Sequence, residues 1–155
     1  MDENAPKGAP RFQADPHSIF WRLHFRSPPS DVFPALATAE GRSRFWAESA
    51  EEEGGVIHFV VPGNLESRGR VIETIPSRSF VAEYFGWTVQ FRLQADPSGG
   101  TDLEMRCHGV PAEDRVEVIA GWVSVLMAMK AAVDFGVDLR NHDPERTWWQ
   151  GYADN

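Results

Sequence analysis

A long, nearly uncharged stretch in the last third of the chain constrains the fold most. Between residues 116 and 133 only Glu117 and Lys130 carry charge. Pro111 and Gly136 are residue types that favour the start and the end of a helix. The stretch therefore predicts one helix over 111–136, about 36 Å long, since each residue adds about 1.5 Å. Because it is apolar nearly all round, it should be covered on more than one face.

The same stretch could be a core helix or a membrane-spanning helix. Val118, Trp122, Val125 and Met129 recur at spacings of three and four and form an apolar stripe. A helix that crosses a bilayer needs about 20 consecutive apolar residues. The uncharged centre, 118–129, is shorter than that. We therefore expect a core helix and no membrane span.

Composition narrows the class of protein. The chain has 155 residues and a formal net charge of −8, which argues against the basic surface that nucleic-acid binding needs. Its one cysteine, Cys107, cannot form an internal disulfide, so a reducing cytoplasm is the expected location. Residues 1–16 are rich in proline and lack the apolar core of a signal peptide, so we expect a flexible arm. Residues 17–155 should form a single domain that ends in a tail, 137–155.

Seven stretches have the features of β-strands. The first, 19–26, alternates apolar and polar side chains, as a half-buried strand does. Two short helices should follow it, one confined to about one turn by Pro34 and the other capped by Thr38. The remaining strand candidates are 47–53, 56–61, 67–75, 79–85, 87–95 and 101–110. Turns rich in glycine and proline separate them, which predicts an antiparallel meander.

This order of elements predicts an α+β fold. A curved antiparallel sheet of about six or seven strands would have one apolar face that needs a cover. The C-terminal helix is the only element long enough to provide that cover. The two short helices after the first strand would close one end of the groove between sheet and helix.

Several short motifs add a family resemblance to this pattern. They are Pro28-Pro29-Ser30-Asp31-Val32-Phe33, Phe45-Trp46, Gly69-Arg70-Val71-Ile72-Glu73, and Gly121-Trp122 with Leu126 and Lys130. In this order they resemble the START-like (helix-grip, SRPBCC) superfamily over residues 18–136. The nearest resemblance is to homologues of the activator of heat-shock protein 90 ATPase. It implies a cavity between sheet and helix that can hold a hydrophobic molecule, without naming that molecule.

The aromatic and methionine residues are the main candidates for lining such a cavity. They should face the space between sheet and helix, and they are Phe45, Trp46, Tyr84, Phe91, Met105, Trp122, Leu126 and Met129. Methionine suits an adaptable pocket because its side chain is flexible and polarizable. The alternative is that these side chains fill the space completely. A filled core and a lined cavity have the same sequence pattern.

Few polar residues stand out as candidates for chemistry. Glu73, Arg106 and His108 lie on expected strands and could offer polar groups to a cavity. The alternative for Glu73 is a solvated outer face of the sheet. The histidines are scattered without the spacing of metal ligands, and no phosphate-binding glycine loop is present. We therefore expect no metal and no cofactor.

Three functional hypotheses remain open. The first is a small protein that binds a lipid or another hydrophobic molecule. The second is an enzyme, similar to a polyketide cyclase or a hydrolase, which needs at least two polar groups converging in the cavity. The third is a co-chaperone-like interaction module or a homodimer. It is motivated by the apolar helix and by Trp148-Trp149 in the tail, which should fold back over the helix or dock on a second subunit.

Overall fold

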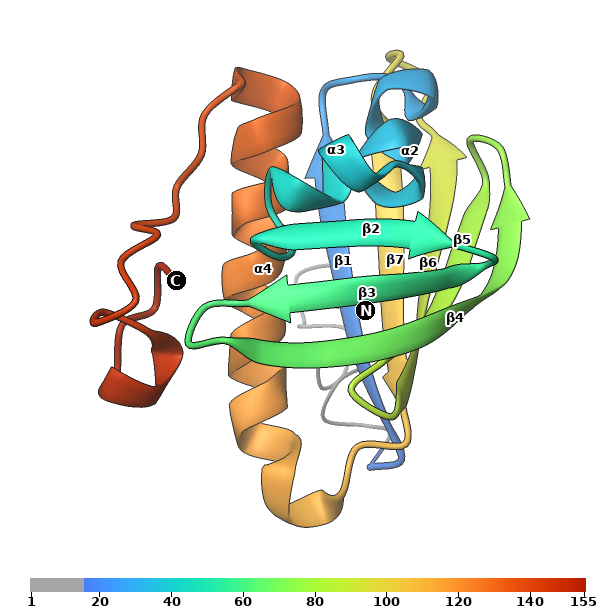
Figure 1. Cartoon of the computed structure of the whole chain (residues 1–155). Coiled ribbons are helices and arrows are strands. Elements are labelled where there is room, and N and C mark those ends of the chain that lie inside the picture. The colour runs from blue at the N-terminus through green and yellow to red at the C-terminus, as the bar shows by residue number, and fades with distance from the viewer. Residues whose placement is uncertain (1–15) are drawn as a thin grey trace, which may run out of the picture.

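A computed structural model describes residues 16–155 (Figure 1). Within them, one antiparallel sheet has the strand order β1-β7-β6-β5-β4-β3-β2. The strands are β1 (Ser18–Phe25), β2 (Ser49–Glu53), β3 (Val56–Val61), β4 (Leu65–Ile75), β5 (Ser79–Tyr84), β6 (Trp87–Ala95) and β7 (Thr101–His108). Strands β2 to β7 pair with their neighbours in sequence, and β1 joins the edge beside β7. The predicted meander is confirmed. The expected arm lies outside the described residues, except for Pro16.

A bend in β4 gives the sheet its curvature. The first part of β4 pairs with β3 and the last part with β5, with a register shift between Val71 and Glu73. Near this bend, a Cβ atom on Gly69 would lie 1.7 Å from the carbonyl oxygen of Glu83, so only glycine allows the two strands to approach. As a result β2, β3 and β4 cross β1 and β7 at a steep angle (Figure 1).

Two short helices, α2 (Pro29–Ala37) and α3 (Ala39–Ser43), connect β1 to β2. The prediction that Pro34 confines the first helix to about one turn was wrong, because α2 has nine residues and continues past it. Pro34 removes a single backbone donor, and the apolar face with Phe33 and Leu36 is buried on both sides of it. The predicted cap is confirmed, since Thr38 Oγ1 accepts a hydrogen bond from Gly41 N at 2.9 Å.

The long helix ends as predicted but begins with a tighter turn. The 3₁₀ turn η1 (Ala112–Asp114) precedes α4 (Arg115–Phe135), and Gly136 stops the helix with a φ of 65°. Asp134 fixes the last turn to the end of β1. Its carboxylate accepts Ser27 Oγ at 2.7 Å and Arg26 N at 3.1 Å. Burial raises the pKa of Asp134, but these bonds outweigh it and hold the pKa below its usual value.

The space between the C-terminal half of α4 and the sheet is filled with side chains. Leu126 and Met129 from α4 meet Phe91 and Met105 from β6 and β7 in one buried cluster. By length and composition alone, the helix formed by η1 and α4 would also qualify as a membrane span. Its buried face against the sheet is instead that of a core helix.

The tail after α4 folds back along that helix, as predicted. It carries one short turn, η2 (Trp148–Gln150), and runs beside α4 on the side away from β5 and β6 (Figure 1). Arg140 anchors it by donating to the carbonyl oxygens of Ala47 at 2.9 Å and Ser43 at 2.7 Å. Trp148 Nε1 donates to Glu117 Oε1 on α4 at 2.9 Å. The tail is therefore held at both ends of the helix.

Candidate ligand-binding cavity

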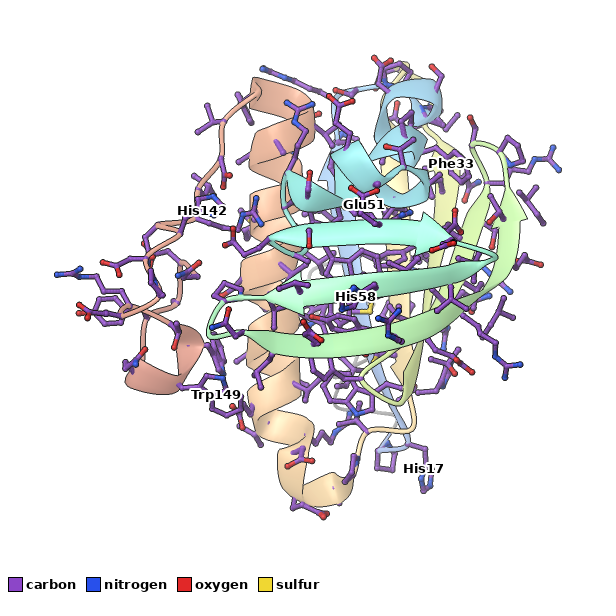
Figure 2. All side chains as sticks on the ribbon, viewed as in Figure 1. His17, Phe33, Glu51, His58, His142 and Trp149 are labelled. Carbon is purple, nitrogen blue, oxygen red and sulfur yellow. The ribbon has the colours of Figure 1, made fainter. Side chains whose placement is uncertain are left out.

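A cavity of about 630 Å³ lies between α4, the tail and the turn that joins β3 to β4. Its lining from α4 includes Glu117, Val118, Gly121, Trp122, Val125 and Met127. The β3–β4 turn contributes Val61, Pro62 and Leu65, and the tail contributes Leu139, Arg140, Trp148, Trp149 and its last three residues. Figure 2 places Trp149 where the tail comes nearest to the β3–β4 turn. Most of this wall is apolar, so the cavity suits an apolar ligand.

Aromatic rings form the inner end of the cavity. Trp46, Tyr84 and Trp122 come from three separate segments and meet with ring centroids 5.4 to 6.0 Å apart. Their planes are tilted, as expected for packed aromatic rings. Phe59 and Phe91 pack behind Trp46, at 4.9 and 5.5 Å. The core therefore holds this aromatic wall rigidly.

The aromatic wall carries two polar groups, the hydroxyl of Tyr84 and the indole N–H of Trp46. Burial raises the pKa of Tyr84 well above its ordinary value, so its phenol is neutral and can donate a hydrogen bond. Trp46 is 4% exposed, and its indole N–H meets no acceptor at hydrogen-bonding geometry. Its interaction with the Tyr84 hydroxyl opposes this rise in the pKa of the phenol. The indole nitrogen is itself buried, so the cavity meets the rings of this wall and not the Trp46 N–H.

The eight aromatic and aliphatic residues singled out from the sequence fall into two groups. Phe45, Trp46, Tyr84 and Trp122 line the cavity. Phe91, Met105, Leu126 and Met129 lie in the filled interior beside it and not in its lining. The space between sheet and helix thus contains both a solid core and one wall of a cavity. A role for either group in ligand binding stays a prediction.

The three polar candidates lie away from the cavity. In β7, Met105 and Cys107 face the core, so the alternation of the strand turns Arg106 and His108 to the outer face. The guanidinium of Arg106 lies 4.7 Å from the ring centroid of Phe20. Glu73 is exposed on β4 and accepts a hydrogen bond from Ser79 Oγ at 2.5 Å. Of the polar side chains singled out from the sequence, only Tyr84 lines the cavity.

Several lining residues were not among the sequence candidates. The β3–β4 turn and Gly121 carry no signal of a ligand site, because a turn and a glycine have many other uses. The adjacent tryptophans Trp148-Trp149 were a signal in the sequence, and in the structure Trp149 lines the cavity while staying 66% exposed. Within residues 16–155, no group of three or more metal-ligating side chains lies together.

A cluster of charged groups holds the tail over the cavity. His142 bridges two carboxylates, with Nδ1 2.8 Å from Glu48 Oε1 and Nε2 2.7 Å from Asp138 Oδ2 (His142 is labelled in Figure 2). The bond to Asp138, then the bond to Glu48, raises the pKa of His142 above its ordinary value. Partial burial raises the pKa of Asp138, but bonds from Arg140 and His142 hold it far below normal. Folding therefore favours the charged forms of both groups.

Comparison with known proteins identifies the family. A family model described as Activator of Hsp90 ATPase homolog 1-like protein matches residues 26–134. The chain belongs to this family. The matched region begins just after β1, covers β2 to β7, both short helices and nearly all of α4, and ends before the tail. No curated protein sequence matches the chain significantly.

Solved structures agree on the fold. Protein SSP2350 from Staphylococcus saprophyticus is 18% identical, with a TM-score of 0.68, over 79% of this chain and 96% of the other. The Aha1 dimer from Colwellia psychrerythraea is 19% identical, with a TM-score of 0.67, over 77% and 97%. CalU16 from Micromonospora echinospora is 24% identical, with a TM-score of 0.60, over 74% and 72%. The START-like, helix-grip fold predicted from the sequence is confirmed.

Proposed function

We propose that this family member is a cytoplasmic protein that binds a hydrophobic small molecule in the cavity between α4 and the tail. One observation carries the proposal, a cavity of about 630 Å³ that ends on the rigid wall of Trp46, Tyr84 and Trp122. Its size falls in the range of small-molecule sites, about 300–1,000 Å³.

Gly121 offers a way to close the cavity without disturbing the core. It lies on α4 in the lining, and a Cβ atom there would meet nothing within 4 Å. A leucine at 121 would therefore extend into open cavity space, and it would also favour the helix more than glycine does. Ala120 is the matched control, because it is the preceding residue on α4, is exposed and does not line the cavity.

The test titrates the protein into 1-pyrenemethanol and follows energy transfer from tryptophan to pyrene. We expect a Kd on the order of 100 μM or tighter, given about −0.3 kcal/mol per non-hydrogen atom. Gly121→Leu should weaken binding at least about tenfold by occupying the cavity, which corresponds to about 1.4 kcal/mol. Ala120→Leu should bind as the unmodified protein does. No binding by the unmodified protein, or equal binding by both variants, would refute the proposal.

A homodimer is a second candidate. Val116, Val123, Met127 and Trp149 expose apolar surface along α4 and the tail, with Val116 81% exposed. Large exposed apolar patches often mark interfaces between proteins. Sedimentation velocity should then show a dimer that Val116→Glu dissociates, and a monomer at all concentrations would exclude this candidate.

A further inference from the structure

The rim of the cavity carries negative charge. Asp114 and Glu117 at the start of α4, and Asp154 at the end of the chain, are exposed and belong to the lining. They border a cavity whose remaining lining is mostly aromatic and aliphatic. A ligand seated on the aromatic wall would therefore meet carboxylates where it leaves the cavity.

The one cation in the described lining is already neutralised. Arg140 donates through Nε and Nη2 to the Asp138 carboxylate at 3.0 Å, and its remaining bonds go to the carbonyl oxygens of Ser43 and Ala47. Its side chain is 9% exposed, so it has little surface to offer an anionic group. A carboxylate, sulfate or phosphate on a ligand would find no free cation in this described lining and would face the acidic rim.

From these observations we infer that the cavity selects an organic cation, an aromatic or aliphatic ammonium compound, over neutral and anionic molecules of the same shape. The inference rests on the function proposed above and adds the charge of the ligand. Tryptophan and tyrosine rings attract cations through their negative faces, and carboxylates add Coulomb attraction. Independently of the rim, the mostly apolar cavity of about 630 Å³ that ends on this aromatic wall points to a ligand.

The test compares three ligands with one ring system and different charges, 1-pyrenemethylammonium, 1-pyrenemethanol and 1-pyrenecarboxylate. We expect the cation to bind about five- to tenfold tighter than the neutral alcohol, and the carboxylate to bind more weakly than the alcohol. Raising the salt concentration from about 0.02 to about 0.5 M should shrink the ratio of cation to alcohol affinity, because salt screens exposed charges. This salt series needs no variant and is unaffected by folding defects.

Charge-neutralising variants test whether the carboxylates of the rim cause the preference for the cation. Asp114→Asn with Glu117→Gln should reduce the ratio of cation to alcohol affinity to about one to two, and the glutamine keeps an acceptor for Trp148 Nε1. Glu40→Gln with Glu53→Gln is the matched control, because it removes the same charge from exposed sites on α3 and β2 outside the lining. Its ratio should stay at that of the unmodified protein.

The outcomes separate the two proposals. If the alcohol binds and the cation binds no better, or if the carboxylate binds best, the charge inference is wrong and the proposed function stands. If none of the three ligands binds, the proposed function itself fails. An equal loss of the ratio in both double variants would assign the preference to the net charge of the chain, and it would overturn the role of the rim.

Discussion

Two sides of α4 are both apolar, but the side that faces the sheet is fully packed, whereas the side beneath the tail borders a cavity. On the side that faces the sheet, Met129 is 0% exposed and packs among Phe91 and Met105. Two positions earlier, Met127 is 47% exposed and lines the cavity beneath the tail. The same residue type on the same helix thus occupies two different environments.

The difference lies in what covers each side. Strands deliver an inward side chain at every second residue, so β6 and β7 meet the helix with a dense, regular set of apolar groups. The tail has no strand or long helix, and its polar residues bond to one another and to the rest of the chain. Asn141 Nδ2, for example, donates to Asp154 Oδ1 at 3.0 Å and to the Arg146 carbonyl oxygen at 3.1 Å. Because the polar groups of the tail bond to one another and to the rest of the chain, the tail can lie over α4 without filling the space beneath it with side chains.

The largest expected effect contrasts the two methionines. Met129→Ala should lower the free energy of unfolding by about 2–5 kcal/mol, because it leaves a void in a filled core. Met127→Ala should lower it by less than about 1 kcal/mol, since its side chain is half exposed beside a cavity. Urea denaturation measures both. Similar losses in the two variants would mean that the two sides of α4 are packed alike.

A second prediction concerns the anchor of the tail. Arg140→Gln should release the tail and cost about 1–3 kcal/mol, because the partly buried carbonyl oxygens of Ser43 and Ala47 lose charged donors. The control is Arg146→Gln, since Arg146 is an exposed partner of Asp143 within the tail, and its loss should cost no more than about 1 kcal/mol. Amide hydrogen exchange of residues 137–155 reports the release. Unchanged protection in Arg140→Gln would show that the tail is held elsewhere.

A change in pH should have a smaller effect on the stability of the folded chain. The pKa of His142 is raised in the folded chain above its ordinary value of 6.5. Its contribution to stability is therefore complete below about pH 6.5 and is lost as pH rises through the raised pKa. The loss should not exceed about 1 kcal/mol, because the side chain is partly exposed and solvent screens it. Asp138 acts in the opposite direction, since its lowered pKa makes its contribution disappear only in acid.

The direction of this pH effect is tested by hydrogen exchange in the tail. The exchange is measured between pH 6 and 9 and corrected for the intrinsic rate. Protection should fall with rising pH in the unmodified protein and stay flat in His142→Asn. Asparagine tolerates the φ of 55° found at this position. A rise in protection with pH would contradict the assigned role of the imidazole.

Sequence reasoning predicted the fold far better than the site. Alternation in strands such as β7, turn residues and the apolar length of α4 are local signals, and they predicted the meander and its covering helix. The failure at Pro34 was also local, because burial of Phe33 and Leu36 outweighed one missing hydrogen bond. The cavity is not a local property. It depends on where residues 137–155 lie, and Arg140 and His142 hold them there through partners outside the tail that are more than 90 positions away.

Nuclear magnetic resonance of the methionine methyl groups tests the central claim most directly. The chain has four methionines, of which Met127 lines the cavity while Met105 and Met129 lie in the filled interior. On adding 1-pyrenemethanol to protein with ¹³C-labelled methionine methyl groups, Met127 should shift strongly and show nuclear Overhauser effects to the pyrene ring. Met105 and Met129 should show no such contacts. Contacts from pyrene to Met105 or Met129, or an unperturbed Met127, would contradict a cavity between α4 and the tail.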